Sequence, residues 1–169
     1  DLVTYGKIIG GGMPVGAYAG SRALMEQVAP TGPIYQAGTL SGNPVAMAAG
    51  LAQLNIITDH SEIYTVMETS ASYIANHLRA SAEKHGIAMQ VNQIGSLLCP
   101  YFTETPVNCY AAAKKSDTKR YAAYFNGMLK RGIYLAPSQF EAMFVSSVHT
   151  QNDLACTVQA AEETLSEMA

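Results

Sequence analysis

The sequence predicts an α/β chain in two parts, and three observations support this. Apolar residues make up 49% and charged residues 14% of the 169 residues, so a packed core is expected rather than disorder. Short apolar runs containing β-branched residues alternate with segments of helical periodicity. Residues 1–58 combine strands and loops with one helix, whereas residues 59–169 are expected to form a compact α+β unit.

The first part begins with a strand-like run at 2–9 that is closed by three glycines, followed by a second short run at 15–19. Ser21 can cap a brief helix. Asn43 and Pro44 form a typical helix start, with Asn as the cap and Pro in the first turn. The helix that they begin, to about Ile57, is apolar on nearly all sides, so we expect it to be buried.

In the second part the sequence predicts five further groups of elements. Ser61 precedes an amphipathic helix that ends near Gly86. Residues 89–102 are typical of a strand, a turn at Gly95 and a second strand. A helix is expected from Asp117 to Gly132, short strands at 134–138 and 144–148, and a final helix after the capping-box pattern at 150–153.

The composition also bears on partners and compartment. A formal net charge of -3 provides no basic field for a nucleic-acid backbone. No apolar run reaches the roughly 20 residues that span a bilayer. The cysteines lack a CxxC spacing and predict reduced, partly buried thiols: Cys99, Cys109 and Cys156. We therefore expect a cytoplasmic protein without nucleic-acid or membrane partners.

The four histidines have no metal-binding spacing, and no metal is expected. His77 and His85 are predicted to be surface residues, and His149 to be structural. The chain begins in a strand-like segment without an initiator Met or a secretory leader, so we expect a fragment of a longer protein.

Lys7 stands at the end of the first expected strand, directly before the glycines, and its environment leaves several interpretations open. It can be an ordinary surface lysine. A P-loop is excluded, because there the glycines precede the lysine. The third interpretation is a lysine that forms a Schiff base with an aldehyde cofactor, held on a fixed strand end where small residues allow the flat ring to approach.

Residues 1–17, DLVTYGKIIGGGMPVGA, resemble the lysine segment of class III aminotransferases, which have fold type I. The resemblance implies that residues 1–58 are the end of the large, cofactor-binding domain. It implies that residues 59–169 are the C-terminal α+β small domain. The cofactor would be pyridoxal 5'-phosphate, and Lys7 would be both its attachment point and the catalytic residue.

Residues 29–44, APTGPIYQAGTLSGNP, are similar to the aminomutase branch of this family. That similarity implies that Gly38 and Thr39 contact the cofactor phosphate of the neighbouring subunit in a homodimer, and that Tyr35 lies near the substrate. A hydroxyl and backbone N–H groups in a glycine-containing loop suit a phosphate dianion. From the residues alone, Thr39 can equally be a turn residue that bonds its own backbone, and Tyr35 a half-buried anchor of the loop.

Residues 134–142, YLAPSQFEA, separate the branches of the family. Many class III transaminases have an arginine-containing strand here, followed by a Pro-Pro-Leu-like run, and both are missing. The segment resembles the aminomutase pattern, in which Glu141 would face the amino groups of the substrate. The alternative is a solvated glutamate at a turn.

The aminomutase resemblance implies conversion of glutamate-1-semialdehyde to 5-aminolevulinate for tetrapyrrole (porphyrin) synthesis, with the cofactor starting in its pyridoxamine 5'-phosphate form. The family's aspartate for the pyridine nitrogen, its stacking aromatic and its substrate-carboxylate arginine precede the lysine segment. We therefore expect the 169-residue chain alone to be inactive. Two alternatives stay open: a class III transaminase that uses an external amino donor, and a non-catalytic, dimerising C-terminal domain.

Overall fold

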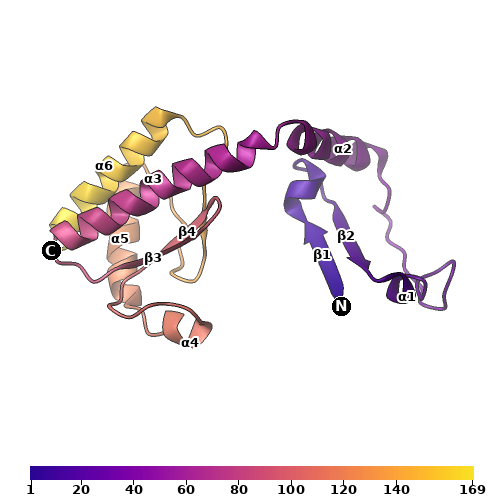
Figure 1. Cartoon of the computed structure of the whole chain (residues 1–169), viewed down its shortest axis with the longest axis horizontal. Helices are drawn as coiled ribbons and strands as arrows, with labels where there is room; N and C mark the ends of the chain where they lie inside the picture. The colour runs from indigo at the N-terminus through magenta and orange to yellow at the C-terminus, as the bar shows by residue number, and fades with distance from the viewer. The chain divides into compact units, whose positions relative to one another are not determined.

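The computed structural model describes all residues, 1–169, and the chain divides into two compact units, Asp1–Ser61 and Glu62–Ala169. Each unit is described by itself (Figure 1). No helix in either unit combines the length and the apolar character needed to cross a bilayer.

Unit 1 begins with an antiparallel pair of strands. β1 (Leu2–Gly6) pairs with β2 (Gly16–Gly20), and Gly6 stands opposite Gly16 at the connected end. The strand expected at 2–9 is shorter than predicted, because the chain turns at Lys7 into a one-turn 3-10 helix, η1 (Lys7–Gly10). The brief helix after Ser21 is confirmed as α1 (Arg22–Met25), but the Ser21 side chain makes no capping hydrogen bond.

The long helix of unit 1, α2 (Pro44–Asp59), begins where the sequence predicts. The side-chain oxygen of Asn43 accepts hydrogen bonds from the backbone N–H groups of Val45 and Ala46, both at 3.1 Å. The expected burial of this helix is wrong: only Ala46 and Gly50 are buried. A helix that is apolar on all sides buries only the face that meets a neighbour, and in unit 1 that neighbour is η1. The large exposed side chains of α2 are Val45, Met47, Leu51, Leu54 and Ile56.

Unit 2 is built on a three-stranded antiparallel sheet in the order β3–β4–β5. The hairpin expected around Gly95 is confirmed as β3 (Gln90–Ile94) and β4 (Leu97–Tyr101). The third strand, β5, has only two residues, Met143–Phe144. The helices of unit 2 are α3 (Glu62–Lys84), α4 (Tyr110–Ala113), α5 (Thr118–Lys130) and α6 (Gln151–Glu167).

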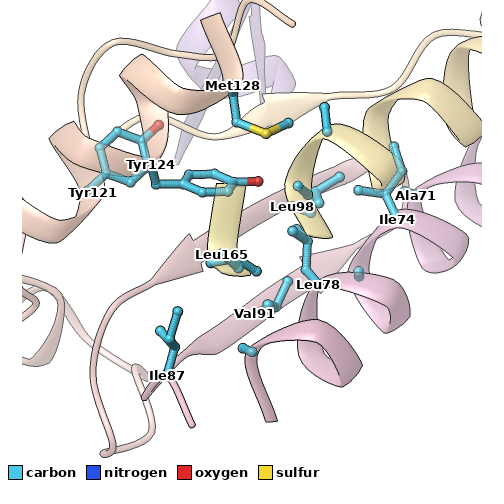
Figure 2. Packing of buried hydrophobic residues seen from close by; sticks show 14 of the residues in the cluster. Ala71, Ile74, Leu78, Ile87, Val91, Leu98, Tyr121, Tyr124, Met128 and Leu165 are labelled. Atoms are coloured by element: carbon cyan, nitrogen blue, oxygen red, sulfur yellow. The ribbon is translucent and has the colours of Figure 1, made fainter. Parts of the chain in front are cut away.

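The hydrophobic core of unit 2 lies where α3, α5 and α6 meet the sheet (Figure 2). The fully buried side chains include Leu78, Leu98, Tyr124, Met128 and Leu165. Helix α6 starts with the predicted capping box, in which the Thr150 hydroxyl and the Asp153 carboxylate each bond the other residue's backbone. The apolar residues that follow this cap at intervals of four, three, four and three belong to the core or pack against it: Leu154, Val158, Ala161, Leu165 and Met168.

Two strand predictions in unit 2 are wrong. Residues 134–138 form no strand, and the strand expected at 144–148 is reduced to the two residues of β5. The pairing of β5 with β4 ends at Leu98 opposite Met143. Antiparallel ladders bond every second pair, so the next bonded pair would join Pro100 with Glu141, and proline has no N–H to donate. The ladder therefore stops there.

Several side chains differ from their expected environment. Cys99 is buried, but Cys109 and Cys156 are exposed free thiols rather than partly buried ones. His85 is half-buried, and its Nε2 lies 2.9 Å from the Glu162 carboxylate, so it is no simple surface residue. His149 bonds the backbone N–H of Ser146 at 2.9 Å, next to the α6 cap.

Glu162 on α6 receives hydrogen bonds from Lys84, Ser81 and His85 at the end of α3, and these bonds lower its pKa from 4.5 to about 2. Because the pKa is lower in the folded chain than in the unfolded chain, this stabilisation is complete above pH 4.5 and is lost as the pH falls toward 2. We expect acidification to lower the urea midpoint of wild type more than that of Glu162→Gln. Glu83→Gln, a change to an exposed carboxylate of α3, is the control and should follow wild type. Parallel acid profiles for all three proteins would contradict the prediction.

Candidate active site

Lys7 lies where β1 gives way to η1, and its side chain is exposed. Its backbone φ is 51°, and it is the only non-glycine residue of the chain with a positive φ. A non-glycine residue in this left-handed region costs on the order of 1–3 kcal/mol and persists only where the surrounding structure fixes it. Residues held in this way cluster at active sites, which marks Lys7 independently of any sequence motif.

The surrounding structure that fixes η1 is a backbone-to-backbone contact with α2. A Cβ atom added to Gly50 of α2 would lie 2.6 Å from the carbonyl oxygen of Ile9, and one added to Gly11 would lie 2.6 Å from the carbonyl oxygen of Ala49. Gly11 also has a φ of 56°, which favours glycine by itself. The two glycines therefore allow η1 to press directly against the helix and hold the lysine at the strand end.

The second predicted element, the loop before α2, presents its polar groups on the surface. The backbone N–H of Ser41 donates to the carbonyl of Gly38 at 2.9 Å, and the N–H of Asn43 donates to that of Leu40 at 3.1 Å. Gly38 and Thr39 are exposed at the start of this turn. Tyr35 is 84% exposed, so within this chain it is not the half-buried loop anchor that was the alternative.

Glu141, the predicted substrate contact, belongs to unit 2. It closes a turn in which its backbone N–H donates to the carbonyl of Ser138 at 3.1 Å, and its side chain is exposed. The residue lines a cavity of about 420 Å³ whose wall includes Tyr134 and His149. Glu141 is the only carboxylate in this wall, and no lysine or arginine lines it. Glu141 therefore lines a cavity whose other residues are mostly apolar and include no lysine or arginine.

The predicted residues thus fall into two groups. Lys7, Tyr35, Gly38 and Thr39 lie in unit 1, and Glu141 lies in unit 2. Sequence reasoning missed the buried side chains that support the Glu141 turn: Cys99, Tyr121 and Gln139. A usable signal was Gln139, a polar residue directly before Phe140 in a segment that is otherwise apolar except for Ser138 and Glu141.

Comparison with known proteins gives the family. The model of the family described as aminotransferase class-III matches residues 1–163. The chain belongs to the class III aminotransferases.

Curated relatives in this family include two proteins named glutamate-1-semialdehyde 2,1-aminomutase. The one from Ruminiclostridium cellulolyticum is 59% identical over 167 residues, which are 99% of this chain and 38% of the relative. The one from Chlorobium phaeobacteroides is 53% identical over 160 residues, which are 95% of this chain and 37% of the relative. The chain thus spans less than two-fifths of the length of these class III relatives.

Solved structures confirm the fold-type-I expectation for the class III chain. A β-phenylalanine aminotransferase from Variovorax paradoxus has a TM-score of 0.88 at 30% identity, covering 99% of this chain and 38% of that one. A glutamate-1-semialdehyde aminomutase from Pseudomonas aeruginosa has a TM-score of 0.85 at 22% identity, covering 100% and 39%. At that identity, the second likeness shows the fold alone.

The class III family implies pyridoxal phosphate, and the residues of unit 1 fit this group. One structural neighbour, with 25% identity and a TM-score of 0.81, is described as a transaminase with PLP bound, covering 99% of this chain and 38% of its own. Covalent attachment of an aldehyde needs an amine at a fixed position, and Lys7 provides one at a conformationally fixed strand end. The exposed turn at Gly38 and Thr39 offers a hydroxyl and backbone groups to a phosphate.

Replacing Gly50 by Ala should displace the lysine. The new Cβ would meet a backbone oxygen that cannot rotate away, and such overpacking typically costs about 1–3 kcal/mol. We expect the full-length enzyme with Gly50→Ala to melt at a lower temperature and to hold several-fold less cofactor on Lys7, measured as borohydride-trapped label. Gly16→Ala in β2, whose Cβ would lie 3.9 Å from its nearest neighbour, is the matched control. Equal labelling of both variants would show that the contact does not position Lys7.

Proposed function

We propose that this chain is the C-terminal part of a pyridoxal-phosphate-dependent intramolecular aminotransferase. The enzyme would convert glutamate-1-semialdehyde to 5-aminolevulinate for tetrapyrrole (porphyrin) biosynthesis in the cytoplasm. The main support is the 59% identity over 167 residues to a relative that is named for this reaction. The unusual backbone of Lys7 supports it independently, since that lysine is the one the chemistry requires.

When bound, the cofactor supplies the exchangeable nitrogen and a ring that accepts an electron pair, so the protein has only to position groups and move protons. Lys7 would attach the aldehyde form of the cofactor covalently and, whenever its amine is free, carry a proton between two neighbouring carbon atoms. A proton carrier must return to the same place in each turnover. The fixed junction of β1, η1 and α2 supports that role because it leaves the Lys7 backbone one conformation.

Gly38 and Thr39 would bind the cofactor phosphate of a neighbouring subunit, and the enzyme would be a homodimer. In this chain their turn faces outward, which supports a contact with a group that the chain itself does not supply. Tyr35 precedes the turn on the same exposed loop and would lie near the substrate.

Glu141 would pair with an amino group of the substrate. A carboxylate at the edge of a largely apolar cavity can accept a charge-assisted hydrogen bond from an ammonium group that enters the cavity. The absence of lysine and arginine from that wall supports this assignment, because no internal cation competes for the carboxylate.

The two units have different places in this proposal. Unit 1 would be the end of the cofactor-binding large domain and unit 2 the C-terminal small domain. The cofactor and substrate contacts that the family has upstream of the lysine segment would come from the rest of the polypeptide. No nucleic acid or membrane takes part.

A second candidate is a class III transaminase that takes its nitrogen from an external donor. It is favoured by one observation, the TM-score of 0.88 at 30% identity with a β-phenylalanine aminotransferase.

The two candidates predict different nitrogen requirements. An aminomutase returns the nitrogen of its own substrate, so the full-length enzyme should form 5-aminolevulinate from glutamate-1-semialdehyde without any added amino donor. The measurement is product formation by purified enzyme in its pyridoxamine 5'-phosphate form over many turnovers. Release of 4,5-diaminovalerate in place of 5-aminolevulinate, limited to a single turnover unless an amino-acid donor restores the amine form of the cofactor, would favour the transaminase.

Lys7→Ala should abolish both covalent cofactor attachment and turnover. Removing the amine leaves the cofactor to bind through non-covalent contacts alone and removes the proton carrier, so we expect a loss of at least about 10³-fold in kcat. The checks are the absorbance of the lysine-bound cofactor and peptide mapping after borohydride reduction. Wild-type label on a side chain other than Lys7 would contradict the assignment. Lys114→Ala, in the loop after α4, should leave label and turnover unchanged.

A further inference from the structure

Side chains hold the turn that carries Glu141 against the sheet, at the point where the pairing of β4 with β5 ends. Beyond Leu98 and Met143, the next bonded pair would join Pro100 to Glu141, and Pro100 cannot donate. The backbone N–H of Glu141 bonds Ser138 instead. Glu141 is thereby released from the ladder, and the carbonyl oxygen of Pro100 is left without a strand partner.

Gln139 takes the place of the missing strand contact. Its side-chain Nε2 donates to the carbonyl oxygen of Pro100 at 2.7 Å, and the residue is only 3% exposed. The Cys99 thiol lies 3.6 Å from the carbonyl oxygens of both Gln139 and Glu141. Residues 139–141 are therefore fixed to β4 through groups on two successive β4 residues.

A third support holds the segment before the turn. The Tyr121 hydroxyl on α5 donates to the carbonyl oxygen of Ala136 at 2.5 Å. Burial, followed by the nearby Cys99 and Glu141, raises the pKa of Tyr121 to about 12. The hydroxyl therefore keeps its proton and its donor role throughout the physiological pH range.

The hydrogen bond from Gln139 holds the loop at a cost to the stability of the folded state. Its Oε1 atom is buried without a hydrogen-bond partner, and a buried unpaired acceptor destabilises the folded state. An apolar side chain of the same length would avoid this cost but would leave the Pro100 oxygen unpaired. Violations of this kind in natural proteins concentrate where function constrains the residue.

We propose that Gln139 is a positioning residue, which fixes the turn of residues 138–141 against Pro100 and so sets the Glu141 carboxylate on the cavity wall for the substrate's amino group. This inference rests on the proposed role of Glu141. Gln139 itself points into the protein and touches no substrate: it is Glu141, two residues later, that lines the cavity.

The test is a double-mutant cycle in the full-length enzyme with Gln139→Met and Glu141→Gln. Methionine has a similar length but cannot donate to Pro100, and a displaced catalytic group loses rate steeply, so we expect about a 10-fold lower kcat/KM for Gln139→Met. Much of that loss should appear as a raised KM, while the absorbance of the cofactor on Lys7 should not change. In the Glu141→Gln background, Gln139→Met should lower kcat/KM no further.

A melting-temperature measurement and a control variant distinguish a positioning role of Gln139 from a purely structural one. The loss in melting temperature caused by Gln139→Met should be equal in both backgrounds, because the Pro100 contact is lost in each. Gln93→Met on β3 is the matched control: its Nε2 bonds Ser72 at 2.8 Å, away from the turn, and kcat/KM should stay at the wild-type value.

The outcomes are distinguishable. Equal kcat/KM losses in both backgrounds, or no loss in either, would overturn the positioning role of Gln139. An unchanged kcat/KM for Glu141→Gln alone would overturn the role of Glu141 and this inference with it. A wild-type enzyme that forms product only with an external donor would contradict the aminomutase function instead, and the same cycle would then be run with that donor.

Discussion

The backbone contact between η1 and α2 is the constraint on which the lysine site depends. Lys7 has a left-handed backbone that is costly for a residue with a side chain, and it needs a rigid support. Gly11 and Gly50 provide it, because the absence of Cβ atoms lets the carbonyl oxygens of Ala49 and Ile9 approach them closely. The Lys7 backbone is therefore held by backbone packing rather than by a network of side chains.

The two units are stabilised in different ways. In unit 1 the buried residues are Gly10, Ala46 and Gly50, so its structure rests on a short ladder, the Asn43 cap and close backbone contacts. Unit 2 has a continuous hydrophobic core between three helices and the sheet (Figure 2). A side chain that must stay in one place needs a rigid support. Unit 1 provides it through close backbone contacts, and unit 2 provides it through its packed core.

In unit 1, glycines hold a residue outside regular strand geometry. In unit 2, Pro100 and Gln139 do the same for Glu141. Pro100 stops the pairing of β4 with β5, which frees the turn of residues 138–141 from the strand geometry that would otherwise govern Glu141. Gln139 then fixes that turn with one buried hydrogen bond. In both units a residue that weakens regular structure lets a proposed site residue leave the strand geometry, and a second contact fixes its position.

The sequence by itself determined the family, the helix caps at Asn43, Asp117 and Thr150, and the β3–β4 hairpin. These features depend on the chemistry of residues that are close together in the sequence. Lys7 could be selected as the candidate amine for the same reason. Only the tertiary structure decided that α2 is mostly exposed, that residues 134–138 form no strand and that Gln139 is buried against Pro100. These features depend on which face meets a neighbour and on a proline 39 residues away along the chain, and local periodicity contains no information about either.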